Sequence, residues 1–342
     1  MPRRGPPVNV AAALLPVLLF LCLLVLLDSF KLVKLRSVLL ALAAGAAAAL
    51  LGARLNEALL DATAWPAAAF SRYAAPVIEE TLKAAWVVLL IRRRRVGFLV
   101  DAAILGFAVG AGFALVENVE YLRALAEPRA LLWLVRGFGT AVLHGATTAV
   151  FAMLAKGLSD RHPDWPRAAL VPGLLAAIAV HSLYNHFFLP PLLATGVLLA
   201  ALPLLVVAVF ERSERATRHW LGVGLDSDLE LVESIVSGRA LQTRVGDYLR
   251  ALSARFPGEV VADMLCLVRI QAELAIRAKG LLLAREAGLE APVGEDVRDC
   301  LQELRYLERS IGRTGLLALG PLRRGGSRDL WQLSLLEEAG PR

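Results

Sequence analysis

Ionisable and amide side chains interrupt apolar stretches in the first two thirds of this 342-residue chain. They are Glu79, Glu80 and Lys83 in one stretch, Glu117 in the next, then His144, and finally His181 and Asn185. Carboxylates and imidazoles transfer protons in catalysis and also bind divalent metals. The residue types therefore predict hydrolytic chemistry or ion binding.

Helical spacing assigns these residues to faces. Lys83 follows Glu80 by three positions and Glu79 by four, so its ammonium can reach either carboxylate within one turn. Adjacent Glu79 and Glu80 point about 100° apart, so only one projects fully into a shared site, and we favour Glu80 slightly. His181 and Asn185 lie one turn apart on one face, as two ligands or two substrate-holding groups must.

The stretch that contains Glu117 also has a stripe of small residues. Gly106, Gly110, Phe113 and Glu117 follow one another at steps of four, three and four residues. Small residues let a neighbouring helix approach closely. The stripe predicts that Glu117 is brought against a partner on another helix.

The elements that carry these residues are predicted to be transmembrane helices. The chain is 57% apolar, and a membrane-spanning helix needs roughly 20 apolar residues. The expected fold is all-α, a polytopic bundle in residues 1–210. Its seven spans run approximately from Asn9 to Leu27, Ser37 to Leu60, Ala74 to Ile91, Phe98 to Leu122, Ala130 to Lys156, Arg167 to Leu189, and Leu192 to Phe210. An ionisable group in hydrocarbon costs about 2.5–3.5 kcal/mol on insertion scales, so such groups should face the bundle interior.

Lys and Arg in the short loops predict the orientation. Basic clusters follow the first, third, fifth and seventh spans, and the four clusters fall on one side of the membrane if the count is seven. Basic loops stay in the cytoplasm, which predicts a multi-pass protein of the cell membrane with its N-terminus outside and its C-terminal region inside. The polar side chains then lie in the outer half of the bilayer. No basic stripe is interleaved with aromatic residues, so nucleic acid is not expected as a partner.

Residues 211–342 have mixed charge with apolar residues at helical spacing, which predicts a soluble cytoplasmic helical region. Gly320 to Ser327 is typical of a flexible break, and the end is expected to be loosely ordered. The three cysteines, Cys22, Cys266 and Cys300, have no zinc-site spacing. With no catalytic motif after Phe210, a regulatory or packing role is expected there.

At this point the motifs resemble a known family. Glu79-Glu80-Thr-Leu-Lys83 is similar to the EExxK signature of PrsW-type intramembrane proteases, and Phe113-Ala-Leu-Val-Glu117 resembles their FxxxE motif. His181-Ser-Leu-Tyr-Asn185 resembles the last His motif of the wider superfamily of CAAX proteases and bacteriocin-processing proteins. The resemblance spans about Ala74 to Phe188.

The resemblance implies an endopeptidase that cleaves a membrane-anchored protein near the outer surface of the bilayer. In the namesake protein the substrate is an anti-sigma factor. The implied catalytic residues are Glu79 or Glu80, Glu117, His144, His181 and Asn185. Relatives that process prenylated proteins carry His where this chain has Glu117, and Arg where it has Lys83, so the resemblance favours the PrsW side.

Two mechanisms are compatible with these residues, and the cofactor is either none or zinc. In the first, Glu80 takes a proton from water while His181 and Asn185 hold the water or the oxyanion. In the second, Zn²⁺ is bound by Glu117, His144 and His181, with Glu80 as the general base. We favour the first slightly, since no HExxH motif is present.

Two other functions use the same residues. A transporter would relay protons or bind a cation through them, although the sequence shows no inverted repeat or paired broken helices. A catalytically inactive member would act as a membrane scaffold. Loss of substrate cleavage in variants of these residues would separate the protease from both alternatives.

Overall fold

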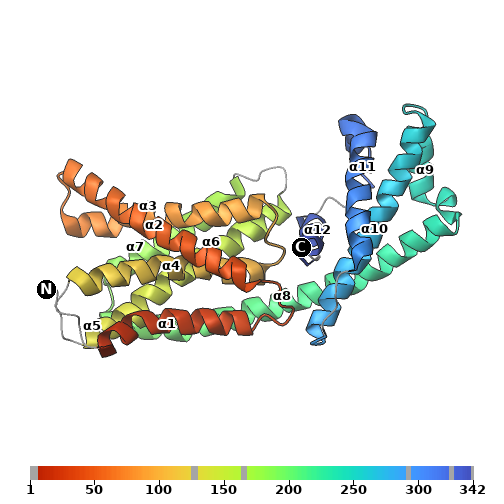
Figure 1. Ribbon diagram of the computed structural model, residues 1–342. Helices are drawn as coiled ribbons and strands as arrows, with labels where there is room; N and C mark the ends of the chain where they lie inside the picture. Colours follow the sequence, from red (N-terminus) through yellow and green to blue (C-terminus); the bar gives the residue numbers. More distant parts are fainter. Residues whose placement is uncertain (1–6, 125–129, 163–167, 290–293, 323–326, 340–342) are drawn as a thin grey trace. The chain divides into compact units, whose positions relative to one another are not determined.

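The computed structural model describes residues 7–124, 130–162, 168–289, 294–322 and 327–339, and within these ranges it contains helices and no strand (Figure 1). The chain divides into two compact units between Ser213 and Glu214. This boundary lies three residues after Phe210, where the composition of the sequence changes. The first unit carries every residue of the predicted site.

Seven numbered helices and the start of an eighth build the first unit. They are α1 (Pro7–Leu26), α2 (Leu35–Ala62), α3 (Ala67–Arg92), α4 (Leu99–Ala124), α5 (Ala130–Leu134), α6 (Val142–Arg161), α7 (Val171–Asn185) and α8 (Pro191–Val236). A π-helical segment, Val135–Ala141, joins α5 to α6, and a 3-10 turn, Ala168–Leu170, precedes α7. The expected start of the sixth span at Arg167 lies outside the described residues.

The helices confirm a multi-pass membrane protein. In the described part of the chain, six helical stretches are long and apolar enough to span a bilayer. The expected third span is α3, which has 26 residues but carries Glu79, Glu80 and Lys83 in its apolar part and is not one of the six. It packs against α2, α4, α6 and α7, so its charged residues lie inside the bundle.

The centre of the bundle is α4. In its most apolar window 83% of the residues are buried, against 11% for α8 and 22% for the region of α7. Small residues allow this packing, because a Cβ on Gly45 of α2 would overlap the Val109 carbonyl, and a Cβ on Gly110 would overlap the His144 carbonyl. The predicted glycine stripe is thus confirmed as a close helix contact, between α4 and α6.

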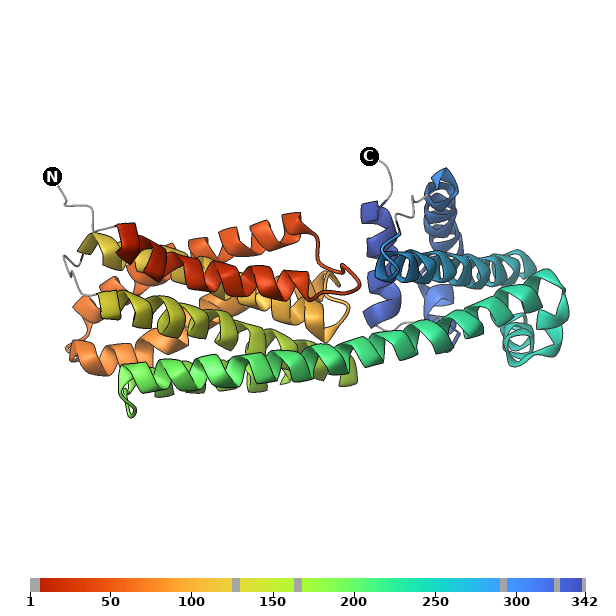
Figure 2. The same ribbon diagram turned by 90° about the horizontal axis from the view of Figure 1, so that it is seen from below.

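The eighth helix continues beyond the end of its predicted span. It runs from Pro191 to Val236, with Pro203 inside it, and Figure 2 shows it as one long helix. Residues 211–236 contain no proline, so the change to a charged composition at Phe210 does not end the helix. The composition marks the limit of the apolar segment, and the helix extends past it.

The second unit is helical, as the sequence predicts for this region. It contains α9 (Arg244–Leu252), α10 (Gly258–Glu286), α11 (Glu295–Ala318) and α12 (Ser327–Ala339). Its own core includes Met264, Leu267 and Leu274 of α10. Half of the expected flexible break at Gly320 to Ser327, residues 323–326, lies outside the described residues, and α12 occupies most of the end that was expected to be loosely ordered.

Candidate active site

A buried ion pair on α3 forms the base of the site. The Lys83 ammonium lies 2.6 Å from Glu80 Oε1, and both side chains are almost fully buried. The spacing allowed Lys83 to reach either glutamate, and in the folded protein it contacts the second one. Each charge offsets the desolvation of the other, which lets both remain in the bundle interior.

Glu80 also connects α3 to two other helices, α6 and α7. Besides Lys83, its Oε1 accepts hydrogen bonds from His181 Nδ1 of α7 at 2.7 Å and from Thr147 Oγ1 of α6 at 3.2 Å. Three donors therefore converge on one carboxylate oxygen. Contacts of this kind orient a carboxylate and hold it as an anion, so Glu80 is placed to organise its neighbours.

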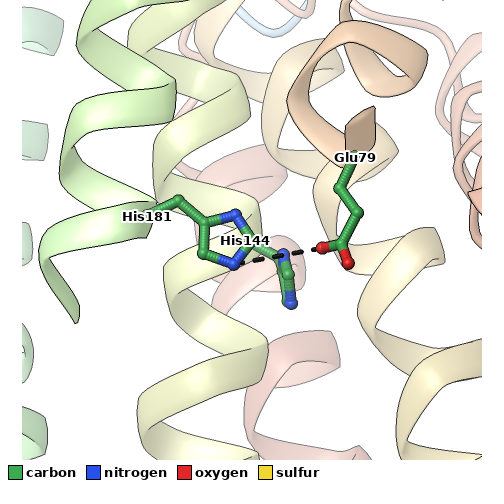
Figure 3. A group of neighbouring side chains, drawn as sticks. All are labelled: Glu79, His144 and His181. Atoms are coloured by element: carbon green, nitrogen blue, oxygen red, sulfur yellow. Dashed lines mark ion pairs between the residues drawn. The ribbon is translucent and has the colours of Figure 1, made fainter. Parts of the chain in front are cut away.

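His181 lies between the two adjacent glutamates. If Nδ1–H donates to Glu80, the other ring nitrogen, Nε2, carries a lone pair. That nitrogen lies 3.9 Å from Glu79 Oε2, the contact drawn in Figure 3. Two acceptor atoms facing each other at this distance are too far apart for a direct hydrogen bond and can be bridged by a water molecule or a cation.

Glu79 is the less constrained of the two carboxylates. Its Oε1 accepts a hydrogen bond from Asn56 Nδ2 of α2 at 3.1 Å, and its side chain is 13% exposed against 1% for Glu80. The sequence favoured Glu80 slightly as the reactive group. In the folded protein one oxygen of Glu79 faces His181, whereas Oε1 of Glu80 has three donors, and the identity of the reactive glutamate stays a prediction.

His144 of α6 connects α3 to α4. Its Nδ1 lies 3.1 Å from Lys83 Nζ, and its Nε2 lies 3.0 Å from Glu117 Oε2. An ammonium can only donate, so Nδ1 accepts and Nε2–H donates to the carboxylate. The predicted partnership of Glu117 with a neighbouring helix is present, and the contact of Gly110 with the His144 backbone makes it possible.

The second carboxylate oxygen of Glu117 lies near Arg136, which belongs to the π-helical segment. Arg136 Nη2 lies 3.4 Å from Glu117 Oε1, and Arg136 Nε donates to Asn118 Oδ1 at 3.0 Å. The guanidinium also stacks 3.5 Å above the Tyr121 ring. The π-helical segment thus presents Arg136 to both Glu117 and Asn118.

Asn185 has a different environment from the other predicted site residues. Its Nδ2 donates to the backbone carbonyl of Ser71 at 3.0 Å, two turns before Glu79 on α3. A role in holding water or substrate stays a prediction.

Sequence reasoning also missed Asn56 and Thr147, although a polar side chain within an apolar segment was a signal that could have identified each.

The residues fit a divalent metal through a different set from the predicted one. Donor atoms of Glu79, His144 and His181 lie within 4.8 Å of one another (Figure 3). Two imidazoles and one carboxylate form a usual ligand set of catalytic zinc sites. Glu117, the carboxylate expected in this set, contacts His144 Nε2 at 3.0 Å, and Glu80 contacts His181 in the way that carboxylates orient metal-binding histidines.

The comparison with protein families covers this whole site. Residues 33–210, slightly more than half of the chain, match the model of the PrsW family of intramembrane metalloproteases. No curated protein and no solved structure matches the chain. The matched segment contains all the spans from α2 to the apolar part of α8, together with the converging glutamates and histidines. The chain therefore belongs to the PrsW family and is an intramembrane protease acting in a lipid bilayer.

Proposed function

We propose that the protein is an endopeptidase that hydrolyses membrane-anchored proteins at a site formed by Glu79, His144 and His181. The observation that carries this proposal is their convergence from α3, α6 and α7 to within 4.8 Å. A membrane-anchored anti-sigma factor, the substrate in the namesake protein, is one candidate substrate. Glu80 and Glu117 complete the site as the carboxylates that hold the two histidines.

Glu79, His144 and His181 would hold a divalent metal such as Zn²⁺. Such an ion supplies a Lewis acid for the scissile carbonyl and lowers the pKa of bound water toward neutrality. Family membership and the donor set both support this assignment.

The other residues of the site keep these three side chains in place. Glu80 accepts from His181 Nδ1 and directs Nε2 toward Glu79. Glu117 holds His144 through Nε2, and Arg136 compensates the charge of Glu117. Lys83 compensates the charge of Glu80. Without these opposite charges, two carboxylates could not remain ionised in the interior of the bundle.

A metal-independent mechanism is the second candidate, and one observation favours it. Both nitrogens of His144 already have partners, Lys83 and Glu117, so binding a metal requires one of these contacts to be exchanged. Without metal, Glu79 would take a proton from water held against His181 Nε2. This assigns to Glu79 the role that the sequence slightly favoured for Glu80.

The orientation supports cleavage near the extracytoplasmic face. His181 lies one turn before the end of α7, and Glu117 lies two turns before the end of α4. Basic clusters such as Arg92 to Arg95 lie at the opposite ends of the helices, which supports a site toward the outside. The N-terminus would then lie outside and residues after Phe210 in the cytoplasm.

The test is to compare membrane proteins in cells that produce the wild type or the Glu79→Gln variant. We expect quantitative proteomics to show at least one single-span protein whose extracytoplasmic part is released only by the wild type. Glu57→Gln serves as the control, because Glu57 is exposed on α2 and pairs with Arg54. Unchanged processing of all membrane proteins, together with an ion flux that depends on Glu79, would overturn the protease proposal in favour of transport.

A further inference from the structure

A proline interrupts the backbone hydrogen bonds of α3 just before the two glutamates. Pro76 lies inside this helix and has no N–H group. In a regular α-helix the N–H of residue 76 would bond to the carbonyl of residue 72. The Arg72 carbonyl therefore lacks its usual helical donor.

A side chain of α7 occupies this acceptor. Ser182 Oγ donates to the Arg72 carbonyl at 2.6 Å, and the contact is partly buried. Within a membrane, freed backbone groups are satisfied by neighbouring side chains such as Ser and Thr, because the hydrocarbon supplies no water. The Ser182 hydroxyl thus replaces, from another helix, the hydrogen bond that Pro76 removes.

The hydrogen bond from Ser182 to the Arg72 carbonyl joins α7 to α3, the helices that carry His181 and the two glutamates. Ser182 directly follows His181, and Pro76 precedes Glu79 and Glu80 by three and four residues. The Arg72 carbonyl, which Pro76 deprives of its helical donor, therefore accepts a hydrogen bond from the residue next to His181. His181 in turn contacts both glutamates. In a regular helix the carbonyl of residue 72 would already be bonded within α3.

We propose that Ser182 is a positioning residue of the protease, which sets the distance between His181 and the Glu79–Glu80 pair by bonding to the carbonyl that Pro76 leaves open. The assignment of an activity to this geometry rests on the proposed function. The coupling between Ser182 and Pro76 does not rest on it.

The experiment is a double-mutant cycle with Ser182→Ala, Pro76→Ala and the two combined. In a protein with Pro76→Ala, the backbone N–H of residue 76 can bond to the Arg72 carbonyl, so the serine hydroxyl becomes redundant. We expect Ser182→Ala to lower the apparent Tm of the purified full-length protein when Pro76 is present, and to have no effect in the Pro76→Ala background. Equal losses in both backgrounds would overturn the proposal.

The activity measurement uses the protein whose cleavage depends on Glu79. We expect Ser182→Ala to lower kcat about 10- to 100-fold with little change in KM, since a displacement of about 1 Å in a reacting group can cost a factor of 10². Ser182→Thr retains the hydroxyl and should restore kcat. A matched control is Ser71→Ala, which removes an exposed hydroxyl that bonds to Ala68 within α3.

The two measurements distinguish the possible failures. If wild type and Glu79→Gln protein process all membrane proteins alike, the proposed function fails, while the Tm cycle still tests the Ser182–Pro76 coupling. If the Tm cycle shows coupling but Ser182→Ala leaves kcat unchanged or Ser182→Thr does not restore it, the positioning role is refuted and the contact serves stability alone.

Discussion

His181 and Glu80 are joined by a 2.7 Å contact between Nδ1 and Oε1, and this contact determines which nitrogen of the ring faces the remaining glutamate. With Nδ1 donating to Glu80, Nε2 presents its lone pair to Glu79 at 3.9 Å. The two neighbouring glutamates therefore have unequal contacts, since Glu80 bonds to Nδ1 of the ring and Glu79 faces Nε2.

This inequality predicts different outcomes for the two glutamine variants. Glu79→Gln should reduce cleavage by about 10²- to 10⁴-fold, the usual contribution of a proton-transferring group, with an unchanged Tm. Glu80→Gln should reduce cleavage and also lower the Tm, because it leaves the buried Lys83 charge without its partner. Thermal unfolding and cleavage assays on the same preparations check this. An unchanged Tm for Glu80→Gln would contradict the organising role of Glu80.

The buried pair predicts a partial rescue of stability by a second substitution. Lys83→Met removes one partner and should destabilise the protein by about 3–5 kcal/mol, the usual cost of breaking a buried ion pair. The double variant Glu80→Gln/Lys83→Met should be more stable than either single variant, since no uncompensated charge remains. Its activity should stay low, because His181 lacks its carboxylate. Additive losses of stability in the double variant would argue against direct pairing.

Arg136 is predicted to act through Glu117 and His144. Arg136→Met should lower kcat by about 10-fold, the lower end of the range for residues that orient metal ligands, because Arg136 reaches His144 only through Glu117. Arg136→Lys should recover only part of the loss, because an ammonium cannot contact Glu117 and Asn118 while stacking on Tyr121 as the guanidinium does. Full activity of Arg136→Met would place Arg136 outside the catalytic arrangement.

Removal of divalent metals separates the two mechanisms. With Glu79, His144 and His181 as ligands, exhaustive chelation should abolish cleavage, and added Zn²⁺ should restore it. His144→Ala should weaken zinc binding, measured by metal content after dialysis, more than Glu117→Gln does. Cleavage that survives complete chelation would instead establish the metal-independent mechanism.

The close contact of α4 with α6 predicts a steric limit at Gly110. A methyl group at this position overlaps the His144 backbone, so Gly110→Ala should destabilise the protein by about 1–3 kcal/mol or more through overpacking. It should also reduce activity, because His144 moves away from Glu117. Gly196→Ala in α8 is the control, since no atom lies within 4 Å of the added methyl group. Equal apparent Tm values for the two variants would show that α6 can move away from residue 110 without loss of stability.

Several features of the site follow from local rules and were accessible from the sequence. The cost of charges in hydrocarbon required the polar residues of α3, α4, α6 and α7 to face the bundle interior. The glycine stripe on α4 indicated a close partner for Glu117, and the spacing of Glu80 and Lys83 indicated an ion pair. The limits of α3 were less accessible, because the helix begins at Ala67 rather than Ala74 and so places Glu79 deeper along it.

The sequence by itself determined that this chain is a membrane bundle of apolar helices with glutamates and histidines turned inward, because apolar length and helical periodicity are local properties. Only the tertiary structure decided that Glu80 contacts Nδ1 of His181, that Glu79 lies within 4.8 Å of both histidines, and that Asn185 bonds to the backbone of α3. These partners come from different helices. Their choice depends on how closely the helices approach and how the imidazole rings turn, and no spacing within a single helix specifies either.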